Sequence, residues 1–63
     1  MDLYDVVELV TDLPEEGLTA GSVGTVVHVF DGPEPAYEIE FADDDGRTLA
    51  TVALTSDKLR RHG

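Results

Sequence analysis

Apolar and polar residues alternate along much of this 63-residue chain, in short runs that turn residues interrupt about every eight to twelve positions. A period of two places successive side chains on opposite faces of a β-strand, whereas an amphipathic helix repeats about every 3.6 residues. No run keeps the longer period over the length of a helix. The pattern therefore predicts a small all-β domain.

Five strands are expected, at residues 5–10, 24–30, 36–41, 47–54 and 59–60. In the first strand, Val7 and Leu9 should face the core on either side of Glu8. In the third strand, the apolar residues of one face alternate with Glu38 and Glu40 on the other. In the fourth strand, Val52 and Leu54 are expected to point inward.

The segments that connect the predicted strands contain residues typical of turns. Residues 11–22 form a long first loop, in which Asp12 resembles a helix N-cap before Pro14, so that at most one helical turn fits. Gly17 is expected to end that turn, and Leu18 to cover the open end of a small barrel. Residues 31–35 are predicted to form a proline-containing turn. Residues 42–46 are predicted to form a hairpin loop with Gly46 in the left-handed conformation, and residues 55–58 to form one 3₁₀ turn.

The length and the net charge of the chain limit its domain organisation and the kinds of molecule that it can bind. A chain of this length predicts a single domain over residues 1–63, and the lack of Cys excludes disulfides and favours the cytoplasm. Fourteen acids against four Lys or Arg give a net charge of −10. That field repels nucleic acids and anionic membranes. Residues 58–63 hold three of the four cations. They are expected to stay solvated as a flexible basic tail, to reach back to the acidic wall, or to reach across to a neighbouring subunit.

The order of the elements resembles an SH3-like barrel: a strand, a long loop, a three-stranded meander, a 3₁₀ turn and a short closing strand. The more specific segments are L-Y-D-V-V at 3–7, D-L-P-E-E-G-L at 12–18, G-S-V-G-T-V-V at 21–27, Y-E-I-E-F at 37–41 and D-G-R-T at 45–48. In combination they are similar to the small bacterial proteins of the domain of unknown function 4926 family. The resemblance covers nearly the whole chain. It implies an SH3-like fold and a bacterial cytosolic origin, and no activity.

Several known sites share single features with the chain. The residues 3–5 look like a motif of polyproline-binding SH3 domains, but the chain has no Trp and only four aromatic residues to line a groove. Residues 21–27 resemble the strand entry of RNA-binding KOW modules. The neighbouring loops are acidic, however, so Gly21 and Gly24 are interpreted as sources of backbone freedom.

The spacing of the residues does not favour a metal-binding or catalytic site. A calcium loop that starts at Asp43 would place Gly46 at its fourth position instead of its sixth. A catalytic carboxylate pair at Glu38 and Glu40 would need a concave pocket that so small a barrel lacks. His28 and His62 do not make a metal site without a third ligand. We therefore expect no catalytic residues, no metal and no cofactor, and we expect that the protein is not an enzyme.

The leading hypothesis is a non-enzymatic, acidic protein-binding module that recognises a basic protein partner, in its sharpest form an antitoxin or immunity-type inhibitor. The expected binding residues are acidic: Glu8, Glu38, Glu40, Asp43, Asp44 and Asp45. The alternative is an accessory or structural subunit of a multi-subunit bacterial enzyme, which would dock through exposed Val6, Val10 or Phe30. Self-association into a homo-oligomer stays open.

Overall fold

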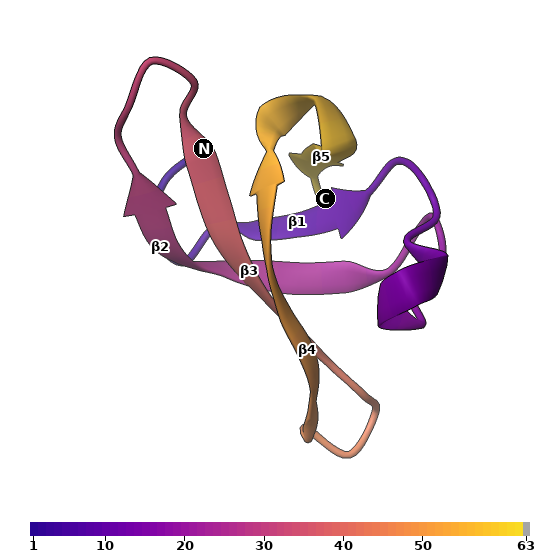
Figure 1. Ribbon diagram of the computed structural model, residues 1–63. Coiled ribbons are helices and arrows are strands. Elements are labelled where there is room, and N and C mark those ends of the chain that lie inside the picture. The colour runs from indigo at the N-terminus through magenta and orange to yellow at the C-terminus, as the bar shows by residue number, and fades with distance from the viewer. Residues whose placement is uncertain (63) are drawn as a thin grey trace.

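The computed structural model describes residues 1–62 and consists of five strands and two short 3₁₀ helices (Figure 1). The strands are β1 (Val6–Leu9), β2 (Val23–Phe30), β3 (Ala36–Ala42), β4 (Thr48–Thr55) and β5 (Leu59–Arg61). The 3₁₀ helices are η1 (Pro14–Glu16) and η2 (Ser56–Lys58). The predicted all-β class is confirmed.

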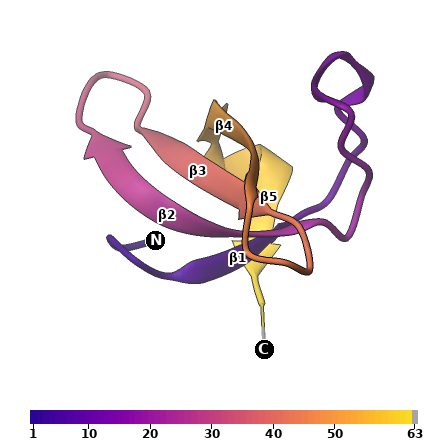
Figure 2. The same ribbon diagram turned by 90° about the horizontal axis from the view of Figure 1, so that it is seen from below.

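All neighbouring strands pair antiparallel in one sheet with the order β4-β3-β2-β1-β5. Figures 1 and 2 show this sheet strongly twisted and curved, with η2 connecting its two edge strands, β4 and β5. Curvature of this kind lets one sheet enclose its own core. The strand order, together with the 3₁₀ turn before the last strand, is that of a small SH3-like barrel.

The core is built from the inward positions that the alternation predicted. Val7 and Leu9 are 0% and 1% exposed, and Ile39 and Phe41 from β3 are equally closed to solvent. The remaining buried side chains are Leu18, Val26, Leu54 and Leu59. The expectation that Leu18 covers the end of the barrel is confirmed, because this side chain is only 4% exposed although it lies in the first loop.

Gly24 is required for a different reason from the one that the sequence suggested. Its φ is not positive, unlike that of Gly21 at 92°, so backbone freedom explains Gly21 but is the wrong explanation for Gly24. A Cβ on Gly24 would lie 2.6 Å from Ile39 Cγ2 and 2.8 Å from the carbonyl oxygen of Glu40. The missing side chain therefore lets β2 and β3 pack tightly over the core.

The first loop contains the single helical turn that was expected, but not the expected cap. Leu13 occupies the N-cap position of η1 with no side-chain bond, so the assignment of Asp12 as the cap is wrong. The Asp12 carboxylate instead accepts the backbone N–H of Ala20 at 2.8 Å, across the loop. A three-residue turn that begins with Pro has few free N–H groups to cap. Gly17 ends the turn with a φ of 70°, as predicted.

The strand boundaries differ from the predicted ones by a residue or two. The strand β4 begins at Thr48 instead of Arg47 because the backbone N–H of Arg47 is held in the loop by the Asp43 carboxylate at 2.9 Å. Pairing after the proline-containing turn resumes at Ala36, opposite Phe30, as predicted. Gly46 adopts the expected left-handed conformation with a φ of 80°.

Candidate docking surface

The six acidic residues that the sequence singled out do not form one surface of free carboxylates. Glu8 lies on β1 beside the last strand, Glu38 and Glu40 lie on the outer face of β3, and the three Asp residues form the β3–β4 loop. Three groups of carboxylates thus have three different environments. The neighbours of each group decide which charges are available to a partner.

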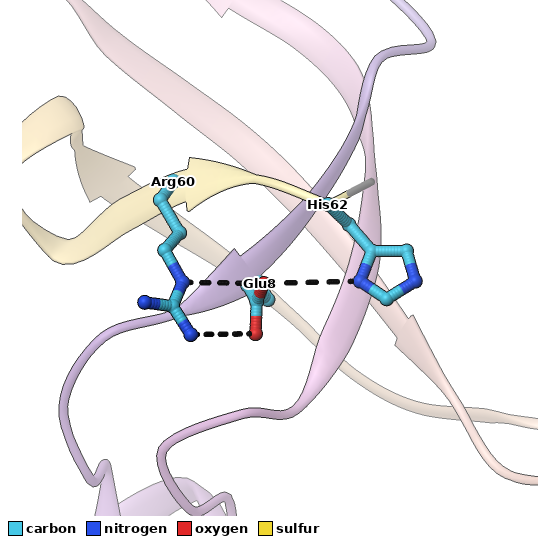
Figure 3. A network of polar contacts seen from close by, with 3 residues as sticks. All are labelled: Glu8, Arg60 and His62. Atoms are coloured by element: carbon cyan, nitrogen blue, oxygen red, sulfur yellow. Dashed lines mark hydrogen bonds and ion pairs between the residues drawn. The ribbon is translucent and has the colours of Figure 1, made fainter.

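Glu8 is already paired within the chain. Its Oε1 lies 3.2 Å from Arg60 Nε, and Arg60 Nη2 donates to its Oε2 at 3.3 Å. On the other side, His62 Nδ1 lies 3.8 Å from Oε1, as Figure 3 shows, and adds an ion pair when the imidazole is protonated. The Glu8 side chain is only 18% exposed. Its charge is therefore compensated, and little of it is open to a partner.

The same contacts lower the pKa of the Glu8 carboxyl. The hydrogen bond from Arg60 is the largest cause that holds the pKa of Glu8 below its ordinary value of 4.5. Burial opposes this shift in the pKa, and the charges of Arg60 and His62 add to it. Glu8 consequently stays ionised to lower pH than a free glutamate.

The end of the chain supplies these cations in an ordered way. Residues 59–61 pair with β1, and the backbone N–H of His62 donates to the carbonyl oxygen of Val6 at 3.0 Å. Arg61 Nη2 also lies 3.5 Å from the Asp5 carboxylate. Up to His62, the segment that could have been a flexible tail thus lies against the acidic wall, which is one of the three alternatives left open.

Glu38 and Glu40 are in the opposite situation. Across the sheet, Glu38 faces His28 on β2 and Ala53 on β4. Glu40 faces Thr25 and Thr51 in the same way. Among the described residues, neither carboxylate forms an ion pair within 4.0 Å; Glu40 is exposed, and Glu38 is half-buried.

The loop that joins β3 and β4 uses one of its acids for its own structure. Asp43 Oδ1 accepts the backbone N–H groups of Asp45 and Arg47, both at 2.9 Å. Asp44 and Asp45 are exposed, and Figure 1 shows the hairpin projecting away from the rest of the barrel. Asp43 is therefore part of the loop structure, whereas Asp44 and Asp45 extend the charge of β3 toward the hairpin tip.

The remaining candidate residues occupy separate places. His28 packs edge-on against Phe30 with ring centroids 4.6 Å apart, while His62 lies beside Glu8. Within residues 1–62, no three His, Asp or Glu side chains are arranged to hold a metal ion. A shallow groove of about 450 Å³ lies between residues 33–35 and residues 55–57. The hydrogen bond from Thr55 is the main cause that lowers the pKa of Asp57 in this groove.

Apolar side chains of the first two strands also reach the surface. Val6, Val10 and Phe30 are 44%, 45% and 42% exposed. Tyr4 is 70% exposed, and its φ of 68° is unusual for a residue with a side chain. Its N–H donates to the carbonyl oxygen of Val26. Tyr4 was not expected to lie in such a turn, because no Gly or Asn marks it in the sequence.

The architecture and the surface define a small acidic SH3-like barrel. The chain belongs to the family described as Domain of unknown function (DUF4926), whose model matches residues 3–61. No curated protein and no solved structure matches the chain. In the part of the chain that the structure describes, neither 3₁₀ helix is long and apolar enough to cross a membrane. The description of the family names no activity that could be transferred to this chain.

Proposed function

We propose that this protein is a non-enzymatic binding module that recognises a basic protein through the outer side of the β3–β4 hairpin. The observation that carries this proposal is the pair Glu38 and Glu40, which form no ion pair within 4.0 Å in residues 1–62. Two carboxylates on one strand face repel each other, and an arriving Lys or Arg relieves that repulsion. A partner with basic residues is therefore favoured over a neutral or acidic one.

The proposed surface, which we call the hairpin face, consists of Glu38, Glu40, Asp44 and Asp45. It is smaller than the set that the sequence suggested. Glu8 is left out because Arg60 already compensates its charge, and Asp43 because its carboxylate binds the loop backbone. The net charge of −10 supports the same function at long range, since it speeds the approach of a basic protein.

The finer form of the proposal is an antitoxin or immunity-like inhibitor in the bacterial cytoplasm, where an acidic small protein covers the basic active site of a toxin. A reading frame for a basic toxin beside the gene would support this form. A gene that stands alone in its surroundings would count against it.

The exposed Val6, Val10 and Phe30 favour a second candidate function, that of an accessory subunit in a larger enzyme. In that case the native protein would be found in a large complex that survives high salt, because apolar contacts are not screened. The hairpin face predicts the reverse, a complex that salt dissociates.

Two double variants with the same change in net charge separate the effect of the hairpin face from the effect of net charge alone. Glu38→Lys with Glu40→Lys reverses the hairpin face. Glu15→Lys with Glu16→Lys makes the same change at exposed residues of η1. Each form, and the unaltered protein, is immobilised and used to capture proteins from extracts of the source organism. The captured proteins are eluted with a salt gradient and quantified by mass spectrometry.

The proposal expects a basic protein that binds the unaltered chain and the η1 variant and that is lost from the hairpin-face variant. Equal loss from both variants would mean that only net charge matters. Retention on the hairpin-face variant would show that this surface is the wrong one.

A further inference from the structure

The two edges of the sheet are protected to very different degrees. The edge strand β5 has three residues, and two of them are Arg60 and Arg61. The other edge strand, β4, has eight residues and contains no charged residue, Pro or Gly. Long uncharged edges invite another strand to pair with them, and proteins usually guard them with charges, prolines or bulges. Only β4 has the composition of an open edge.

The backbone of β4 has a partner on one side. It pairs with β3 from Ala36↔Thr55 to Ala42↔Thr48, and the described hydrogen bonds of loops and turns include no backbone group of residues 48–55. An irregularity at the start of β4, where Leu49 is 58% exposed, limits the regular edge to residues 50–55. Six residues are enough for the backbone ladder of one added strand.

The carboxylates of Glu38 and Glu40 lie on β3, the strand next to this open edge. On the outer face, Thr51 stands beside Glu40 and Ala53 stands beside Glu38. A strand added to β4 would lie two strand spacings, about 9.5 Å, from β3. Lys and Arg have long side chains, and only the short side chains of Thr51 and Ala53 would lie between them and the two carboxylates.

We propose that β4 binds an extended segment of the basic partner as a sixth strand, with Lys or Arg at alternate positions above Glu38 and Glu40. This inference rests on the proposed function and specifies how the partner is recognised. Backbone hydrogen bonds to β4 provide affinity that does not depend on the sequence of the segment. The period of two of a strand then selects segments in which basic residues occur at every second position.

A second copy of the chain fits this edge less well. Pairing of β4 with β4 of another copy would bring two molecules of charge −10 together, with both pairs of uncompensated glutamates near the new contact. Repulsion of this kind opposes association, most strongly at low salt. Charge therefore favours a basic segment over self-pairing.

The test uses a synthetic peptide, Thr-Lys-Val-Lys-Val-Lys-Thr with blocked ends, against the intact protein. Its control has the same sequence with N-methyl groups on alternate backbone amides, which keeps the charge and removes the donors on one edge. A second control methylates the other set of amides, since either edge of the peptide can face β4. Affinities are measured by calorimetry, and amide hydrogen exchange of β4 is followed by NMR with and without peptide.

We expect at least one methylated peptide to bind about tenfold more weakly than the unmodified peptide, because it loses two or three backbone hydrogen bonds. Amides within residues 50–55 should exchange more slowly in the complex. Thr51→Lys with Ala53→Lys should weaken binding because the new cations compensate Glu38 and Glu40 from within the chain. Thr19→Lys with Ala20→Lys, a matched change at exposed residues of the first loop, should weaken it less.

Three results would overturn strand addition. Equal binding of all three peptides that is lost in Glu38→Gln with Glu40→Gln would leave the hairpin face standing and reject the added strand. Absence of binding by the unmodified peptide would also reject it, while the capture experiment separately decides the proposed function. Protection without peptide of the β4 amides that point away from β3, together with a dimer in sedimentation, would assign the edge to a second copy.

Discussion

The acidic residues of this protein differ in role because of their immediate neighbours. Glu8 has the Arg60 guanidinium 3.2 Å away, whereas Glu40 has only the hydroxyl-bearing Thr25 and Thr51 beside it across the sheet. Asp43 binds backbone N–H groups of its own loop. A carboxylate that stabilises the fold and one that is free to bind a partner can thus have the same charge and lie in similar strands.

Titration of Glu8 should be visible in the stability of the fold. Its folded pKa is lowered, so its contribution is present above the unfolded value and is lost as pH falls through the folded value. We expect Glu8→Gln to lower the free energy of unfolding at pH 7 and to reduce its decline below about pH 4.5. Urea titrations between pH 7 and pH 2.5 measure both effects.

Glu16→Gln is the matched control, because Glu16 is exposed on η1 and forms no ion pair in residues 1–62. Its pH dependence should follow that of the unaltered protein. A Glu8→Gln protein with the same pH dependence as the unaltered protein would show that the contact with Arg60 does not stabilise the fold.

Gly24 tests the packing of β2 on β3. Gly24→Ala places a methyl group 2.8 Å from the Glu40 carbonyl oxygen and should cost about 1 to 3 kcal/mol of unfolding free energy. Gly32→Ala is the control, since a Cβ there meets nothing within 4 Å and its φ is not positive. Equal stability of the two variants in urea denaturation would contradict the account of Gly24.

At the scale of elements, β5 closes the barrel although it has only three residues. Leu59 pairs opposite Leu9 and is 6% exposed, while Arg60 and Arg61 form ion pairs with Glu8 on β1 and with Asp5 just before it. The buried Leu59 side chain and the two ion pairs compensate for the small number of backbone hydrogen bonds that so short a strand can form. Most of the stabilisation should come from the buried leucine, because exposed ion pairs contribute little.

Two Leu→Ala variants separate the contribution of the buried Leu59 to stability from the effect of removing apolar surface in general. Leu59→Ala should lower the unfolding free energy by about 3 kcal/mol, in the range typical of buried leucines. Leu49→Ala should change it by less than about 0.5 kcal/mol, because Leu49 is 58% exposed at the edge of the sheet. Circular dichroism during urea denaturation measures both, and a small effect at Leu59 would show that β5 is dispensable.

The elements could be predicted because each strand carries a local signal. Alternation placed Val7, Leu9, Ile39 and Phe41 in the core, and Gly17 and Gly46 marked the ends of two turns. Two of the errors, Asp12 as a cap and Arg47 as a strand residue, occurred where a side chain bonds to backbone several residues away. Such a bond competes with local propensity and leaves no periodic pattern.

The candidate surface was less predictable, because it depends on contacts between distant parts of the chain. Glu8 and Arg60 are 52 positions apart, and only the pairing of β1 with β5 brings them together. Thr51 and Ala53 have no chemistry of their own. Their relevance follows from the register that places them beside Glu40 and Glu38. The sequence did, however, identify Glu38 and Glu40 as two carboxylates on one face.

For the whole molecule, a charge of −10 on 63 residues means that the fold is maintained against self-repulsion. We expect the melting temperature to rise between about 10 mM and 500 mM NaCl, because salt screens this repulsion more than it weakens the few ion pairs. Sodium chloride is chosen because it is only weakly excluded from protein surfaces. A melting temperature that falls with salt would mean that the ion pairs of β5 outweigh the repulsion.

The same charge would draw any cation to the molecule, but the hairpin face should collect cations more strongly than the other acidic residues. The direct measurement is an NMR titration of the protein, labelled with ¹⁵N, with a tetralysine peptide at low salt. The account predicts the largest shifts at Glu38, Glu40, Asp44 and Asp45, and small shifts at Asp5 and Glu8, which Arg61 and Arg60 already occupy. Shifts centred on η1, or spread evenly over all the acids, would contradict the hairpin face as the docking surface.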